Sequence, residues 1–88
     1  MTTIKKSAFA GSLESSDVFV EISPAEELSL SIESTVFERF GKAIEKAVRD
    51  ELSRLSVEKA AVRVSDRGAL DCVIKARIET AVKRAEVE

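Results

Sequence analysis

Apolar and polar residues alternate in the early part of the chain, a pattern typical of strands that bury one face. Residues 6–14, 18–22 and 28–33 are each predicted to form a strand. The polar strings ESSD and SPAEE between them are predicted turns, because Ser, Asp and Pro favour turn geometry. In the second strand Val18, Val20 and Ile22 are expected to point inward. The residues expected to share one face are Phe9, Gly11 and Leu13 in the first strand and Leu28, Leu30 and Ile32 in the third.

The apolar period changes from two residues to 3.6 at Thr35, which predicts a helix. The string TVFE favours a capping box, in which Thr35 caps the first turn and Glu38 reaches back to the free backbone N–H. A short strand is predicted at residues 60–64, then a DRG turn, then a second helix from Ala69. The residues expected to face the core are Phe37, Phe40, Ile44, Val48, Leu52 and Leu55 in the first helix, and Leu70, Val73, Ile74, Ile78, Ala81 and Val82 in the second.

The predicted order is therefore strand, strand, strand, helix, strand, helix. Elements in this order favour an α+β layer fold, here a small single-layer antiparallel or mixed β-sheet covered on one face by two α-helices. With 88 residues the chain is long enough for one domain and not for two, so residues 1–88 are expected to form a single domain.

Composition narrows the classes of protein. The chain is 44% hydrophobic and 34% charged, typical of a soluble globular protein and not of a disordered chain or a membrane protein. The net charge of -2, with no basic cluster among the four Phe residues, argues against nucleic-acid binding. The apolar stretch after Lys5 and Lys6 is too short for a signal peptide, and the single Cys72 fits a reducing compartment. We therefore expect a cytoplasmic protein.

The residues that usually carry chemistry are scarce. The chain has no His, so the usual general base, metal ligand and triad member are missing. Cys72 has no CxxC partner, and we interpret it as a small helix residue. The glycines are too far apart for a phosphate-binding loop. Neither catalytic residues nor a metal site are predicted, and Ser15 and Ser16 are ordinary turn residues by composition alone.

Three strings nonetheless resemble one known family. AGSLESSDVFVEISP at residues 10–24, IESTVFERFGKAI at residues 32–44 and DRGALDCVIKARIETAV at residues 66–82 resemble the acyl carrier protein, or gamma subunit, of citrate lyase. The resemblance covers nearly the whole chain. The LES string and the GALDCVI string resemble strings that are characteristic of this family, and the spacing between them resembles the family's spacing.

The resemblance implies a covalent attachment site. In this family the serine after the Leu–Glu pair carries 2'-(5''-phosphoribosyl)-3'-dephospho-CoA, joined to the hydroxyl by a phosphodiester. By its position in the string that serine is Ser15, and not Ser12 or Ser16. The family often has a glycine where this chain has Ser16, so two adjacent hydroxyls stand here in a less permissive turn.

The resemblance also implies a function and partners. The thiol of the attached arm carries acetyl and citryl thioesters between a transferase (alpha) and a lyase (beta) subunit while citrate is cleaved to oxaloacetate and acetate. A holo-carrier synthase attaches the arm. The chain itself is then a non-catalytic subunit, a single acyl-carrier domain whose family is distinct from the helical-bundle carriers of fatty-acid synthesis.

Five further residues are candidates for recognition. Glu14 and Asp17 flank the serine pair and suit a modifying enzyme that brings a magnesium-bound, phosphate-rich donor, and Ser16 borders the site. Arg77 and Arg84 lie seven residues apart on one helical stripe. Either their stems cover apolar surface, or their guanidinium groups bind the phosphates of the arm or an acidic partner surface.

Two other functions stay open. The carrier subunit of malonate decarboxylase uses the same kind of arm, although the string GALDCVIKARIE favours the citrate lyase type. In the other alternative the chain is an unmodified protein-interaction module, and ESSD is only a turn. An intact mass of the native protein separates the carriers from the unmodified module.

Overall fold

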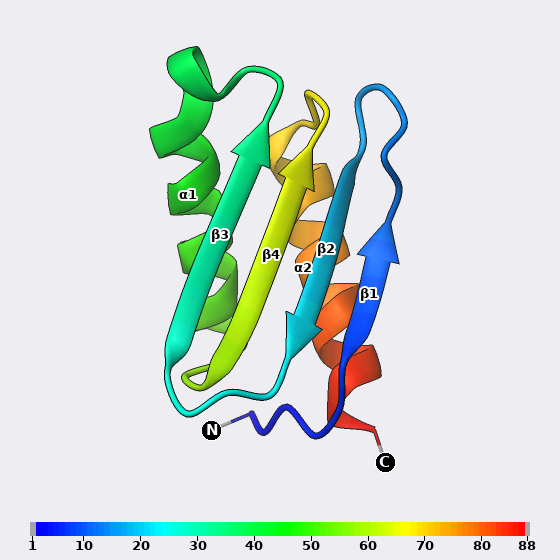
Figure 1. Ribbon diagram of the computed structural model, residues 1–88, viewed down its shortest axis with the longest axis vertical. Helices are drawn as coiled ribbons and strands as arrows, with labels where there is room; N and C mark the ends of the chain where they lie inside the picture. The colour runs from blue at the N-terminus through cyan, green and yellow to red at the C-terminus, as the bar shows by residue number, and fades with distance from the viewer. Residues whose placement is uncertain (1, 88) are drawn as a thin grey trace.

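The computed structural model describes residues 2–87 and has the order of elements that the sequence predicts (Figure 1). The elements are β1 (Ala8–Gly11), β2 (Val18–Ser23), β3 (Leu28–Ser34), α1 (Phe37–Arg54), β4 (Ala60–Asp66) and α2 (Asp71–Glu86). Neither helix within residues 2–87 has the length and apolar character needed to cross a membrane.

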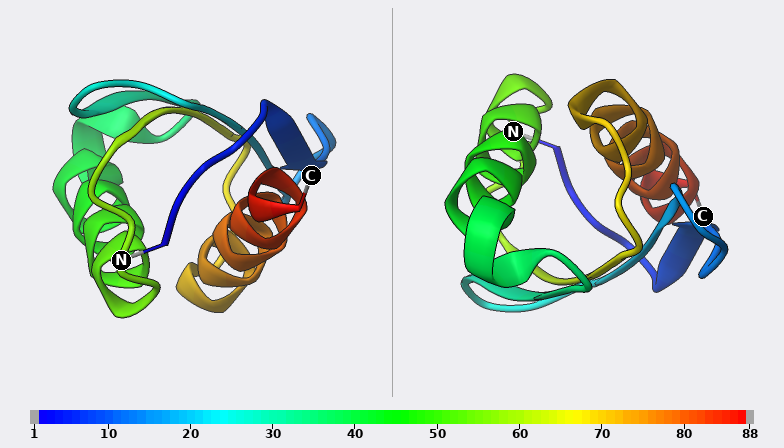
Figure 2. Two further views of the ribbon diagram at one scale, coloured as in Figure 1. Left: turned by 90° about the horizontal axis from the view of Figure 1, so that it is seen from below. Right: turned by 90° about the horizontal axis from the view of Figure 1, so that it is seen from above.

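The strands form one mixed sheet in the order β1-β2-β4-β3. β2 pairs antiparallel with both β1 and β4, whereas β3 runs parallel to β4, to which α1 connects it. Both helices cover the same face of the sheet, as the views along the strands show (Figure 2). α2 packs against β1 and β2, and α1 packs against β3 and α2. The predicted α+β fold with two helices on one face is confirmed.

The core lies between this sheet face and the two helices. β2 and β4 contribute alternate residues to it, because successive side chains of a strand point to opposite faces. The alternation predicted for β2 and the stripes predicted for the middle of both helices are confirmed. The largest fully buried apolar side chains are Val18, Val20 and Ile22 of β2, Val62 and Val64 of β4, Val48 and Leu52 of α1, and Ile74, Ile78 and Val82 of α2.

The first strand, predicted over residues 6–14, spans only Ala8–Gly11, and the face that its apolar pattern indicated points away from the core. Phe9 is 60% exposed, whereas Ala10 is 1% exposed. Ala10 is the register partner of Val20, so both residues point to the covered face, where α2 packs closely and a small side chain fits. Phe9 lies on the open face, where its ring centroid is 5.6 Å from that of Phe19.

The prediction for the helix starts was also wrong. α1 begins at Phe37 with Val36 as N-cap and without a side-chain hydrogen bond there, so the Thr35–Glu38 capping box does not form. Phe37 and Phe40 are half exposed, because the first turn of α1 projects beyond the end of the sheet (Figure 1). Leu70 precedes α2 and is 71% exposed.

The buried Asp66 organises the end of the sheet at which β3 and β4 finish. Its carboxylate accepts hydrogen bonds from the Ser34 hydroxyl at 2.7 Å and from the backbone N–H groups of Gly68 and Ala69 at 3.1 and 3.0 Å. These bonds satisfy a charge that would otherwise be costly to bury. Asp66 thereby holds the turn between β4 and α2 in place.

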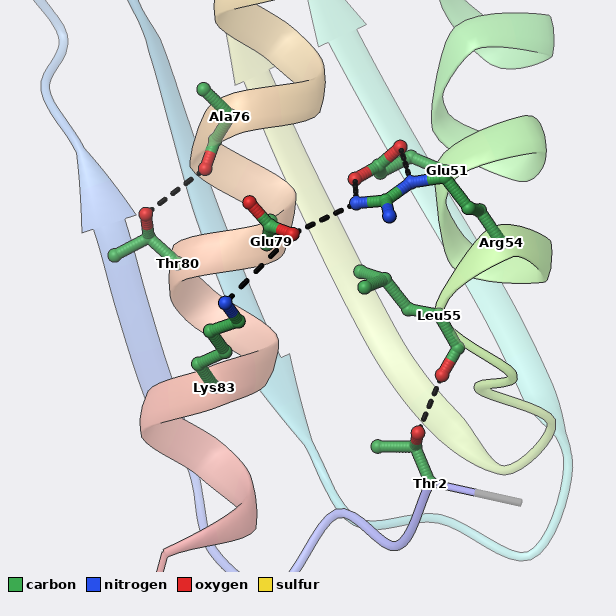
Figure 3. Close-up of polar contacts among 8 residues, drawn as sticks. All are labelled: Thr2, Glu51, Arg54, Leu55, Ala76, Glu79, Thr80 and Lys83. Carbon is green, nitrogen blue, oxygen red and sulfur yellow. Dashed lines mark hydrogen bonds and ion pairs between the residues drawn. The ribbon is translucent and has the colours of Figure 1, made fainter.

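A separate ionic cluster joins the helices nearer the opposite end (Figure 3). The Arg54 guanidinium donates to both carboxylate oxygens of the buried Glu51 at 2.9 and 2.6 Å, and to Glu79 of α2 at 2.8 Å. The hydrogen bonds from Arg54 lower the pKa of Glu51. This cluster explains why an acid occupies a core-facing position of α1.

Candidate functional site

The LES string lies in the loop between β1 and β2, which we call the serine loop (residues 12–17). The loop lies at the same end of the molecule as the β4–α2 turn and the first turns of both helices (Figures 1 and 2). Leu13, Glu14, Ser15 and Ser16 of this loop are all exposed. The sequence-predicted attachment site is therefore accessible.

Backbone hydrogen bonds tie the serine loop to the β4–α2 turn. The N–H of Ser16 donates to the carbonyl of Arg67 at 2.7 Å, and the N–H of Arg67 donates to the carbonyl of Asp17 at 2.9 Å. Both bonds continue the antiparallel β2–β4 ladder past its last pair, Val18 and Asp66. The base of the loop is thus an extension of the sheet, and only its tip projects.

The carboxylate of Asp17 closes the loop. One oxygen, Oδ2, accepts from the Ser12 hydroxyl at 2.7 Å and from Nη2 of Arg77 at 3.2 Å. The other, Oδ1, accepts from the Val18 N–H at 2.7 Å and from Nε of Arg77 at 3.1 Å. The hydrogen bonds from Ser12, Val18 and Arg77 lower the pKa of Asp17 to about 2, so the carboxylate is charged at neutral pH.

Gly11 makes the loop possible at its other end. Its φ of +89° lies in the region that favours glycine, and a Cβ there would lie 1.8 Å from the carbonyl oxygen of Val18. Sequence reasoning placed Gly11 on a strand face and missed this role. The signal was available, since a glycine directly before a polar turn often marks a positive φ.

The three serines of the loop differ in how they are held. The Ser12 hydroxyl is engaged, because it donates to Asp17 and accepts from the N–H of Glu14 at 3.3 Å. Ser15 and Ser16 are exposed, and within residues 2–87 neither hydroxyl makes a hydrogen bond. Ser16 has a φ of 66°, the left-handed conformation that glycine adopts most easily. A glycine at this position would therefore be less strained than the serine.

The two arginines of the predicted stripe do not act together. Arg77 turns to the serine loop and binds Asp17. Arg84 donates through Nη1 to the carbonyl of Phe9 at 2.9 Å, on the edge of β1. Sequence spacing placed both on one side of α2, but it did not indicate that only Arg77 has a carboxylate opposite it.

Within residues 2–87 no group of three or more His, Cys, Asp or Glu side chains is arranged to hold a metal ion. Cys72 is exposed in the first turn of α2. The serine loop is therefore the best candidate site.

Replacing Ser16 with glycine should stabilise the fold. A non-glycine residue in the left-handed region is strained, so relief of that strain is expected to raise the free energy of unfolding by about 0.5 to 1 kcal/mol. Urea denaturation of Ser16→Gly measures it. Ser15→Gly is the matched control, because Ser15 has no positive φ and gains nothing from glycine. A lower stability of Ser16→Gly would contradict the expectation.

The ionised Asp17 should make stability depend on acid pH. Its pKa is lowered from 3.8 to about 2, so its contribution is complete above pH 3.8 and is lost as the pH falls through 2. Asp17→Asn should therefore be less stable than the natural chain at pH 6, and the difference should shrink between pH 4 and pH 2. Thermal melts across this range measure it, with Glu14→Gln as the control for losing an exposed loop charge. A difference that stays constant with pH would refute the assignment.

Comparison with known proteins places the chain in a family. Residues 5–85 match the family model ACP, described as the malonate decarboxylase delta subunit (MdcD). The citrate lyase acyl carrier protein of Escherichia fergusonii is 51% identical over 84 residues, which cover 93% of this chain and 87% of that protein. The protein of the same name from Rhodopseudomonas palustris is 52% identical over 83 residues, which cover 93% of this chain and 86% of that protein.

A solved structure shares the fold. One chain of a Pseudomonas malonate decarboxylase hetero-tetramer in complex with malonate superimposes with a TM-score of 0.82 and 18% identity, over 93% of this chain and 86% of that chain. At this identity the likeness concerns the fold alone. The curated relatives are carrier proteins by name, in agreement with the expected non-catalytic subunit. Since about half of its residues are identical to theirs over nearly its whole length, the chain belongs to the family of citrate lyase acyl carrier proteins.

Proposed function

We propose that the chain is the acyl carrier subunit of a citrate lyase and that Ser15 carries 2'-(5''-phosphoribosyl)-3'-dephospho-CoA through a phosphodiester. The observation that carries the proposal is the position of Ser15, which is the serine of the LES string and stands exposed on an anchored loop. When bound, the group supplies the thiol that holds the acyl substrate as a thioester.

The serine loop fits such a group. The hydrogen bonds that hold the loop run through the Ser12 hydroxyl, the Ser16 N–H and the groups of Asp17, so a phosphodiester on the Ser15 hydroxyl breaks none of them. The loop base stays fixed while a long substituent at its tip is free to move. A tethered substrate gains effective concentration at each active site it reaches.

The acids of the loop have different roles in this proposal. Both oxygens of Asp17 already accept hydrogen bonds from Ser12, Val18 and Arg77, so Asp17 holds the loop. Glu14 is exposed beside Ser15 and is the carboxylate that we assign to the magnesium-bound donor on the holo-carrier synthase. Ser16 borders the contact, and Arg84 stays a candidate for an acidic partner surface.

The malonate decarboxylase carrier is the second candidate, because the matching family model bears that name and a chain of that complex has the same fold. The identity of about 50% to citrate lyase carriers, against 18% to the malonate decarboxylase chain, favours the citrate lyase type. The cytoplasmic location stays a prediction that rests on the single thiol of Cys72.

The end that bears Ser15 is also rich in exposed apolar side chains. They are Leu13, Val36, Phe37, Phe40 and Leu70. An arm on Ser15 enters an active site only if this end faces the enzyme, and exposed apolar groups suit the core of such a contact. We therefore assign this apolar end to the contact with the synthase and with the transferase (alpha) and lyase (beta) subunits.

Ser15→Ala should abolish attachment of the arm without unfolding the domain. Removing one exposed hydroxyl should change stability by no more than about 0.5 kcal/mol, since the side chain makes no internal contact that the fold needs. Co-expression with the holo-carrier synthase, followed by intact mass and peptide mapping, measures attachment. Ser16→Ala is the control and should still be modified at Ser15. Modification that persists in Ser15→Ala, or an unmodified natural chain, would refute the proposal.

Leu70→Ser should weaken contact with the synthase. Leu70 is 71% exposed in the turn between β4 and α2, at the same end of the molecule as the serine loop, so serine there removes apolar contact area and leaves the core untouched. The KM of the synthase for the unmodified chain should rise about tenfold, the effect of losing about 1.4 kcal/mol of binding. Val87→Ser is the matched control, because Val87 is 60% exposed near the end of α2, away from the serine loop. An equal KM for both variants would contradict the assignment of the apolar end to the contact with the synthase.

A further inference from the structure

We propose that Arg77 is a positioning residue for Ser15, acting through Asp17 to hold the serine loop in the shape that the holo-carrier synthase meets. The inference rests on the proposed attachment at Ser15. Arg77 belongs to α2 and is 60 residues away from Asp17 in sequence, so only the tertiary fold brings the two together. Arg77 is on α2 and not in the serine loop, and the proposed role requires no contact between its side chain and the arm.

The geometry of the pair fixes the orientation of the carboxylate. Nε and Nη2 of Arg77 each donate to a different oxygen of Asp17, at 3.1 and 3.2 Å. Such a paired contact restrains both position and rotation, which a single charge does not. The Asp17 side chain is 16% exposed and that of Arg77 is 42% exposed, so the pair is only partly open to water.

The oriented carboxylate in turn closes the loop. Oδ2 receives the Ser12 hydroxyl from the start of the loop, and Oδ1 receives the Val18 N–H just beyond its end. Ser15 lies between these two anchors. Arg77 therefore restrains both sides of the segment that presents the serine, although it contacts only Asp17 by hydrogen bonds.

The stem of Arg77 supports the same arrangement. A Cβ on Gly11 would lie 3.3 Å from Cδ of Arg77, so the arginine side chain lies directly against the base of the loop. α2 also packs against β1, where the buried Ala10 allows close approach. Helix, strand and loop base thus form one packed unit beneath the serine.

Loss of Arg77 should loosen the loop more than the fold. The backbone bonds to Arg67 and the Ser12 and Val18 bonds to Asp17 remain available without it. A partly exposed ion pair contributes little to global stability. A mobile loop, by contrast, must be ordered when the enzyme binds, and small misplacement of a reacting hydroxyl has a large effect on rate.

The test measures attachment and loop order separately. In Arg77→Met, kcat/KM for arm attachment by the synthase, followed by intact mass, should fall by about tenfold to a hundredfold. Amide hydrogen exchange in residues 12–17 of the unmodified chain should become faster, while the melting temperature changes little. Arg77→Lys should recover only part of the rate, because an ammonium group cannot make the paired contact. Arg49→Met, which removes an ion-paired arginine from α1, is the matched control and should alter neither readout.

A double-substitution cycle identifies the route. If Arg77 acts through Asp17, Arg77→Met should have almost no further effect on attachment in an Asp17→Asn background. An equal loss in both backgrounds would mean that Arg77 contacts the arm or the synthase directly, and it would overturn the inference. An unchanged rate of amide hydrogen exchange in residues 12–17 of Arg77→Met would overturn the inference as well. If the natural chain is not modified at all, the proposed function fails, and the exchange experiment alone decides whether Arg77 orders the loop.

Discussion

The arrangement of the candidate site depends on the pairing of β2 with β4. The register from Val18 with Asp66 to Ser23 with Ala61 sets the valines of both strands on one face, where the two helices bury them. The same ladder continues through Ser16, Asp17 and Arg67, and so it brings the serine loop to the β4–α2 turn. The same strand pairing therefore aligns the core residues of β2 and β4 and positions the serine loop.

Two aspartates stabilise the turns at this end in similar ways. Asp66 is buried and accepts bonds from a serine hydroxyl and two backbone N–H groups. Asp17 accepts from a serine hydroxyl, a backbone N–H and an arginine. In each case a charged acceptor organises several donors at once, which is stronger than neutral hydrogen bonding. The result is a base held by several hydrogen bonds below an exposed serine, which suits the proposed attachment of a mobile substituent there.

The fold persists at low sequence identity. The malonate decarboxylase chain keeps it with a TM-score of 0.82 at 18% identity. Many apolar residues satisfy the same alternating and helical patterns, so the core can change while its architecture stays. In the proposed function the chemistry resides in the attached group, so the chain has to supply only an accessible hydroxyl and surfaces for its partners.

The sequence by itself determined the order of elements, the inward faces of β2 and the middle turns of both helices, because local periodicity specifies which side of an element is apolar. Through resemblance it also led to the proposal that the serine of the LES string, Ser15, is the attachment site. Only the tertiary structure decided which apolar residues are buried. In β1 the buried residue is Ala10 and not Phe9, because α2 packs close to that face of the strand. Phe37 and Leu70 stay exposed because they lie beyond the region where the helices pack on the sheet. The pairing of Arg77 with Asp17 could not be predicted from the sequence either, since a contact between residues 60 positions apart depends on the tertiary fold and not on any local pattern.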